Sequence, residues 1–162
     1  MRTTSASLFT ILLLAFFAGC ATENKPTKTG LELQSFQRRE FETPKKVVFA
    51  SVLSVFQDLG YIVESADLNT GFITAKSPTK ARTGWGENMG RKHFMTDTKA
   101  TAFIEELRTN NTSIRLNFVE TEEQTSGVGD KIVQDNPIED PKFYEDVFAK
   151  IQQAIFVRSG TQ

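Results

Sequence analysis

The chain contains few residues of the kinds that carry out chemistry. Among its 162 residues are one cysteine, Cys20, one histidine, His93, and one tryptophan, Trp85. Nucleophilic catalysis needs a base beside the nucleophile, and a protein zinc site needs several His, Cys or carboxylate ligands close together. His93 has neither a second histidine nor a cysteine near it in the sequence. We therefore expect no enzyme activity, no metal site and no cofactor.

The most unusual stretch runs from residue 77 to residue 98, where the sequence shows no apolar periodicity. This pattern predicts a long loop, and such loops are often functional or disordered. An indole with cations beside it can contact an anionic lipid headgroup or a glycan by stacking and charge. In the alternative interpretation, the loop folds its indole back onto the sheet edge. The candidate interaction loop comprises Trp85, Arg82, Arg91 and Lys92.

Acidic residues are concentrated in a second polar stretch towards the end of the chain. Paired carboxylates can act as acid and base when a cleft separates their pKa values. In a polar stretch that contains glycine, a solvated surface is the better interpretation. The residues concerned are Glu120, Glu122, Glu123, Asp130, Asp135, Glu139 and Asp140.

Cys20 follows a segment with the order of a bacterial export signal. A short polar start carries Arg2, an apolar run begins at Leu8, and the small pair Ala18-Gly19 precedes the cysteine. This order is typical of a secretory signal peptide. The run is shorter than the roughly 20 residues that a helix needs to cross a membrane. We therefore expect residues 1–19 to be removed.

The segment Phe17-Ala18-Gly19-Cys20 resembles a lipobox, the processing site of bacterial lipoproteins, although Phe17 stands where an aliphatic residue is usual. The resemblance implies cleavage after Gly19, a diacylglycerol thioether on Cys20 and an acyl chain, such as palmitate, on the new amino terminus. Several acyl chains hold a protein to a membrane far more strongly than one. The alternative is an ordinary signal peptide beside an incidental cysteine. In lipoproteins, Asp after the cysteine retains the protein in the inner membrane, so Ala21 implies the periplasmic face of the outer membrane.

Composition limits the rest of the chain to one ordinary domain. Hydrophobic residues make up 39% of the sequence and include 14 phenylalanines, which is enough for a single core. Without residues 1–19 the chain has 18 basic and 20 acidic residues. This balance gives no general attraction to nucleic acid. We expect a signal peptide at 1–19, a flexible tether at 20–30 and one domain at 31–158.

The apolar pattern predicts an α+β domain. We expect a mostly antiparallel sheet of about five strands with two helices packed on one face, in the order β-α-β-β-β-β-α. The first helix follows Thr43-Pro44 and ends at Gly60, and the second begins at Asp140-Pro141. The expected strands are 33–42, 61–65, 71–75, 100–107 and 113–121.

Parts of this pattern resemble a known group. The segments Arg39-Glu40-Phe41, Phe56-Gln57-Asp58-Leu59-Gly60-Tyr61, Gly71-Phe72-Ile73-Thr74-Ala75-Lys76 and Asp140-Pro141-Lys142-Phe143-Tyr144 are similar to a family of uncharacterised bacterial lipoproteins. More distantly, they resemble the helix-grip repeats of the lipoprotein subunit of the outer-membrane barrel-assembly machine. The matching residues are packing and turn residues, so the resemblance implies a helix-grip-like fold rather than an activity.

Two functions fit these expectations. The first is a membrane-anchored envelope lipoprotein whose periplasmic domain has an interaction or structural role without catalysis, contacting an envelope protein, peptidoglycan or lipid. The second is a carrier of a small apolar ligand in a cavity between helix and sheet. The arrangement of the phenylalanine side chains distinguishes the two functions. Close packing would indicate a core, whereas phenylalanines that surround an empty cavity would indicate a ligand site.

Overall fold

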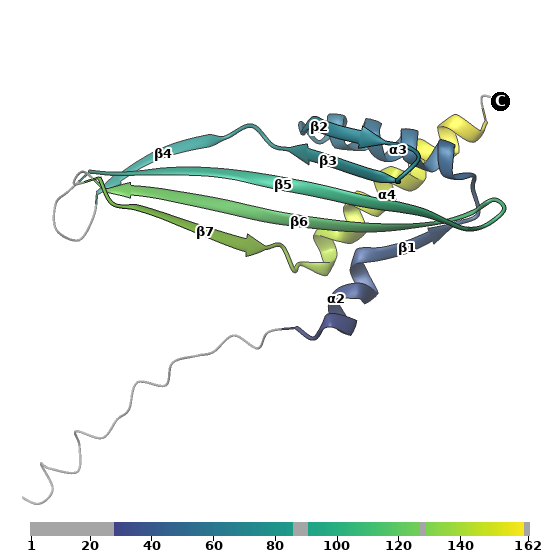
Figure 1. Cartoon of the computed structure of the whole chain (residues 1–162), viewed down its shortest axis with the longest axis horizontal. Helices are drawn as coiled ribbons and strands as arrows, with labels where there is room; N and C mark the ends of the chain where they lie inside the picture. Colours follow the sequence, from purple (N-terminus) through teal and green to yellow (C-terminus); the bar gives the residue numbers. More distant parts are fainter. Residues whose placement is uncertain (1–27, 86–90, 127–128, 161–162) are drawn as a thin grey trace, which may run out of the picture.

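The computed structural model describes residues 28–85, 91–126 and 129–160 (Figure 1). The elements are α2 (Gly30–Gln37), β1 (Arg38–Phe41), α3 (Lys45–Asp58), β2 (Ile62–Asp67), β3 (Phe72–Lys76), β4 (Lys80–Trp85), β5 (Arg91–Arg108), β6 (Asn111–Ser126), β7 (Lys131–Pro137) and α4 (Pro141–Ser159). None of the helices in these ranges is both long enough and apolar enough to span a membrane.

All the strands belong to one antiparallel sheet built around two long strands. β5 has 18 residues and β6 has 16, and they pair along almost their whole length around a turn at Asn110, whose φ is 60°. At one end of this pair the strand order is β2-β3-β5-β6-β1, and at the other end β4 pairs with β5 and β7 pairs with β6. The α+β class and the antiparallel sheet are confirmed, but the described chain has seven strands and three helices instead of five and two.

The core lies between the sheet and the helices α3 and α4. Side chains that recur every three or four residues along each helix meet alternate side chains of β3, β5 and β6. Figure 1 shows that the two helices cover the half of the sheet that contains β2 and β3. The buried hydrophobic residues are Val48, Phe49, Val52, Val55, Phe56, Ile73, Ala75, Ala100, Ala102, Ile104, Ile114, Leu116, Phe118, Tyr144, Val147, Phe148, Ile151 and Ile155.

The helix ends follow local sequence rules with small differences. Asp140 caps α4 by accepting a hydrogen bond from the backbone N–H of Lys142 at 3.0 Å. The first core helix begins one residue later than expected, with Pro44 at the N-cap. Gly60, at φ +83°, follows that helix as expected. Gly71, at φ +81°, ends the turn between β2 and β3, and its carbonyl accepts from the N–H of Ile104 at 2.9 Å.

The predicted strand at 33–42 is wrong over its first half, because residues 30–37 form α2, whereas β1 occupies residues 38–41. A capping box begins this helix: the Thr29 hydroxyl accepts from the N–H of Glu32, and the Glu32 carboxylate accepts from the N–H of Thr29 at 2.7 Å. The hydrogen bond from the Thr29 backbone lowers the pKa of Glu32. The Thr-x-x-Glu spacing was the sequence signal for this helix.

The long loop predicted at 77–98 is also wrong, and the second polar stretch likewise contains strands. Most of the stretch 77–98 is a β-hairpin formed by β4 and the beginning of β5, and the later acidic stretch continues β6 and forms β7. Strand alternation is visible in a sequence when one face of the sheet is buried. Here the helices α3 and α4 lie over the other half of the sheet, so both faces of these strands accept polar residues.

Tyr144 closes a gap in the edge of the sheet. β1 pairs with β6 from Thr112 to Arg115, and β7 pairs with β6 from Val119 onwards, which leaves Leu116–Phe118 between them. The buried Tyr144 hydroxyl accepts from the N–H of Phe118 and from the Gln37 amide, both at 3.3 Å. Burial raises the pKa of Tyr144, so the hydroxyl stays neutral.

Candidate interaction surface

The predicted interaction residues lie in a hairpin and not in a loop. In the β4–β5 ladder Arg82 pairs with Phe94, Gly84 with Lys92, and Trp85 with Arg91. The Arg82 guanidinium lies 4.7 Å from the centre of the Phe94 ring, a cation–π contact. The backbone thus brings these residues together, while the side chains of Trp85 and Arg91 lie outside the described part of the structure.

This hairpin belongs to what we call the outer half of the sheet, which consists of β4, residues 91–98 of β5, residues 120–126 of β6, and β7. Figure 1 shows this half extending away from α3 and α4. Side chains alternate between two faces along each strand. In the remaining half of the sheet, α3 and α4 cover one of these faces. We call this face the helix-side face along the whole sheet, and we call the second face the opposite face.

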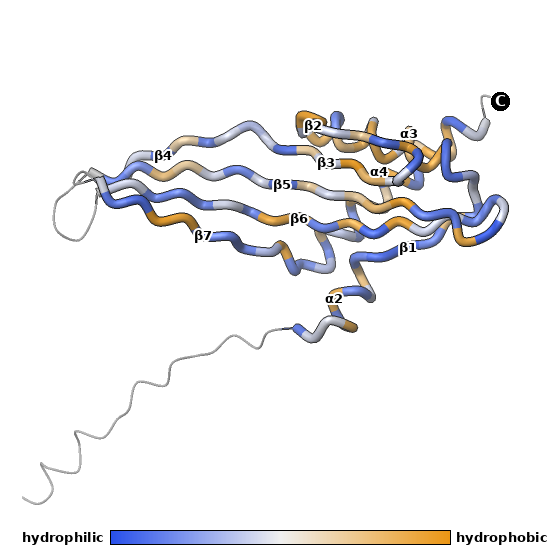
Figure 2. Tube along the Cα trace, in the orientation of Figure 1, coloured by the Kyte–Doolittle hydropathy of each residue, from blue (hydrophilic) through white to orange (hydrophobic). Residues whose placement is uncertain are grey.

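Exposed apolar side chains lie on both faces of the outer half. The ladder places Phe94, Gln124 and Ile132 side by side on the helix-side face, and Met95 and Val133 on the opposite face. The exposed fractions are 59% for Ile132, 54% for Val133 and 47% for Met95. Figure 2 shows the apolar stretch of β7 against largely hydrophilic neighbours. Apolar groups surrounded by polar ones are common at sites of protein contact.

Among the acidic residues of this region, Glu120, Glu122, Glu123 and Asp135 lie in strands, whereas Asp130, Glu139 and Asp140 lie outside them. Glu123 pairs with Lys131 at 2.9 Å, and Asp135 accepts a hydrogen bond from the Thr121 hydroxyl at 2.7 Å. Glu122 lies on the helix-side face, so β6 distributes its acidic side chains over two faces. This arrangement fits the interpretation of a solvated surface.

His93 is exposed on the opposite face, between Thr83 and Thr125 of the neighbouring strands. No group of three or more His, Cys, Asp or Glu residues that could hold a metal ion occurs within the described ranges. Cys20, the predicted lipid attachment site, lies outside the described residues.

The described surface has several shallow cavities. One, of about 350 Å³, lies where the helix layer ends and the outer half begins, and its lining includes Tyr61, Lys80 and Glu120. Another, of about 500 Å³, lies on the opposite face beneath α2, where the rings of Phe72 and Phe103 are 4.7 Å apart.

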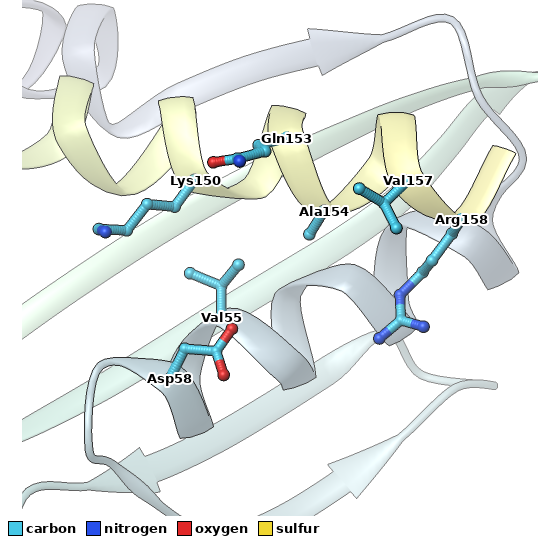
Figure 3. A pocket seen from close by; sticks show the side chains of 7 residues that line it. All are labelled: Val55, Asp58, Lys150, Gln153, Ala154, Val157 and Arg158. Carbon is cyan, nitrogen blue, oxygen red and sulfur yellow. The ribbon is translucent and has the colours of Figure 1, made fainter. Parts of the chain in front are cut away.

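A third cavity, of about 380 Å³, is a groove between α3 and α4 (Figure 3). Asp58 contributes from α3, and Lys150 and Gln153 contribute from α4. Arg158, also in the lining, donates a hydrogen bond to the Ser54 hydroxyl. The lining also includes Val55, Ala154 and Val157, so the groove is of mixed polarity. It lies between two helices, and it differs from the apolar helix–sheet cavity that a carrier would need.

The phenylalanines that would line such a helix–sheet cavity are close-packed. Phe56 and Phe118 are fully buried with ring centres 6.0 Å apart, and Phe148 is also fully buried. Phe49 is 7% exposed and belongs to the same cluster. By the criterion set from the sequence, these side chains form a core.

No protein-family model matches the chain, and no curated protein sequence matches it.

Proposed function

We propose that this protein is a lipid-anchored lipoprotein of the bacterial envelope, and that its periplasmic domain binds another envelope component through the outer half of the sheet. The observation that carries the interaction role is the exposure of Ile132, Val133 and Met95 on strands that the helices leave open. The anchor at Cys20 rests on the lipobox-like segment.

Physical arguments support an interaction role over a catalytic one. Sheet edges and apolar patches promote association, so proteins usually cover or blunt them. This chain instead extends four strands beyond its core, with exposed apolar side chains on both faces. A permanent lipid anchor would hold this surface close to the membrane and to its partners.

The carrier function is the weaker candidate. It requires a void beside Phe56 and Phe118, whereas these rings pack edge to face in the buried core. Opening a cavity there would remove packing that stabilises the core. Truncating one buried phenylalanine to alanine typically lowers the free energy of unfolding by about 3–5 kcal/mol.

The anchor is tested by labelling cells with radioactive palmitate. We expect label in the wild-type chain and none in Cys20→Ala, while Lys92→Ala, a change on the sheet, should retain it. Label that persists in Cys20→Ala would contradict attachment at this cysteine.

The interaction surface is tested by site-specific photo-crosslinking in intact cells. A photoreactive residue at Met95 should give a discrete adduct, and the same residue at Gln153, which is exposed on α4, should not. Equal adducts at both positions, or none at Met95, would contradict a role for the outer half.

A further inference from the structure

The sheet has four edge strands, and they differ in how well they could accept another strand. β1 has only four residues, and β2 contains an irregularity in register between Val63 and Ser65. β4 carries Lys80 and Arg82, so two copies of it would repel each other. These are the ways in which proteins commonly protect an edge. β7 has seven residues paired in regular register with β6, and β6 is its only partner among the described strands.

The hydrogen-bond pattern shows which backbone groups of β7 point away from the sheet. The N–H of Ser126 donates to the carbonyl of Asp130 and the N–H of Ile138 to the carbonyl of Phe118, both at 2.9 Å. In an antiparallel ladder, hydrogen-bonded pairs alternate with non-bonded pairs. Every second residue between these two bonded pairs therefore forms backbone hydrogen bonds with β6. In β7 these residues are Ile132, Gln134 and Asn136.

It follows that Lys131, Val133 and Asp135 direct their N–H and C=O groups outwards. Their side chains all lie on the opposite face, because alternate residues of a strand share a face. Lys131 and Asp135 stand at equal distances on either side of Val133. If two copies of this segment are laid antiparallel about Val133, each Lys131 faces the partner's Asp135.

We propose that β7 pairs antiparallel with β7 of a second copy of this chain, with the twofold axis at Val133. This pairing rests on the proposed function and deepens it, because it names a second copy as a partner of the outer half. The outward backbone groups of Lys131, Val133 and Asp135 would bond to those of Asp135, Val133 and Lys131 in the other copy. Every hydrogen-bonded pair then joins outward-facing residues, as the ladder requires.

The side chains also fit this register. Val133 meets Val133, which buries two side chains that are each 54% exposed, and Lys131 meets an aspartate of opposite charge. Lys131 already pairs with Glu123, but an ammonium group has three donors and can bind a second carboxylate. On the helix-side face Ile132 lies opposite Gln134. The antiparallel arrangement puts the helix-covered halves at opposite ends of the joined sheet.

The size of the contact indicates where it would form. Stable protein interfaces bury about 1,200–2,000 Å² in total, which is more than one pair of five-residue segments supplies. Confinement to a membrane raises the effective concentration of two anchored copies. We therefore expect the pair to form between copies anchored in a membrane.

The first test uses a cysteine on the twofold axis in the full-length, anchored chain. In a hydrogen-bonded antiparallel pair the two Cα atoms lie about 5.5 Å apart, within the range of a disulfide. Val133→Cys should give a covalent dimer on mild oxidation of membranes. The matched control is Ala81→Cys, an exposed position on the other outer edge, with the wild-type chain as the background for Cys20.

The second test reverses charges in the Val133→Cys chain. Adding Lys131→Asp places acid opposite acid, and adding Asp135→Lys places base opposite base, so each variant alone should lose most of the covalent dimer. When the two variants are expressed together with tags of different size, each Asp again faces a Lys. A mixed dimer at or near the original yield should return.

Restored mixed dimer with no dimer from Ala81→Cys would support the proposal. Equal dimer from Val133→Cys and Ala81→Cys would overturn it, and so would a dimer that is insensitive to the charge reversals. A cross-link only to a different protein would also overturn it and would assign β7 to another partner. If Val133→Cys gives no covalent dimer, while the chain still incorporates palmitate and gives its Met95 adducts, self-pairing is rejected and the proposed function still stands.

Discussion

At the scale of single residues, Tyr144 does more than fill the core. Its hydroxyl is the partner of a strand N–H that neither β1 nor β7 reaches, and it also accepts from Gln37 on α2. A buried N–H without a partner destabilises a fold by about 1–3 kcal/mol. Tyr144 therefore links the sheet, α4 and α2 at one oxygen.

We expect Tyr144→Phe to reduce the free energy of unfolding by about 1–3 kcal/mol, because the ring still packs while the N–H of Phe118 loses its acceptor. Urea unfolding followed by circular dichroism measures the change. Tyr61→Phe is the control, since Tyr61 is only partly buried, and it should cost less. Equal losses from the two variants would contradict the bridging role of Tyr144.

Some residue roles could be predicted from the sequence because they depend only on close neighbours. Asp140 before Pro141 indicated a helix start, and Gly60 indicated a helix end, as found. The role of the Tyr144 hydroxyl could not be predicted in this way. It arises where β1 stops and β7 begins along β6, and that gap is a property of the sheet topology.

At the scale of elements, two glycines with almost the same φ separate the cost of a left-handed backbone from the cost of crowding. Gly60 and Gly71 have φ of +83° and +81°, but a Cβ at Gly60 would meet open space while a Cβ at Gly71 would lie 2.1 Å from the carbonyl oxygen of Ile104. The turn between β2 and β3 thus requires its backbone at Gly71 to lie close to the backbone of Ile104 in β5.

We expect Gly60→Ala to cost about 1–2 kcal/mol, which is the cost of a left-handed conformation for a residue with a Cβ. Gly71→Ala should cost about 1–3 kcal/mol more, because backbone atoms must move apart to admit the methyl group. Thermal or urea unfolding of the two variants measures the difference. Similar stabilities would show that β3 and β5 separate without penalty.

The elements that could be predicted from the sequence are those with one buried face. α3, α4 and the inner parts of β5 and β6 show clear apolar periodicity, whereas β4 and β7 do not. Their residues form strands because β5 and β6 extend far enough to pair with them. The candidate interaction residues Arg82 and Lys92 could be singled out by type, but their place in a hairpin could not be predicted.

At the scale of the whole molecule, the chain combines a packed half with an open half that share two continuous strands. The inner parts of β5 and β6 lie beneath helices, and the outer parts extend away from them (Figure 1). Amides in regions with few buried apolar contacts open more easily than those in a core. The outer half should therefore be the more dynamic part of the same ladder.

Hydrogen exchange measures this difference directly. We expect amides of residues 100–104 and 114–118 to exchange at least about tenfold more slowly than those of residues 93–97 and 121–125, since about 1.4 kcal/mol of extra opening free energy gives that factor. Uniform protection along both strands in the monomeric chain would contradict the division into two halves.

The proposed lipid anchor depends on where the mature chain begins and on what its first residue carries. Mass spectrometry of the N-terminal peptide from protein purified out of membranes answers both questions. We predict a peptide that begins at Cys20 and carries a diacylglycerol and an amide-linked acyl chain. A membrane-derived peptide that extends before Cys20, or that begins there with an unmodified thiol, would contradict the lipid anchor.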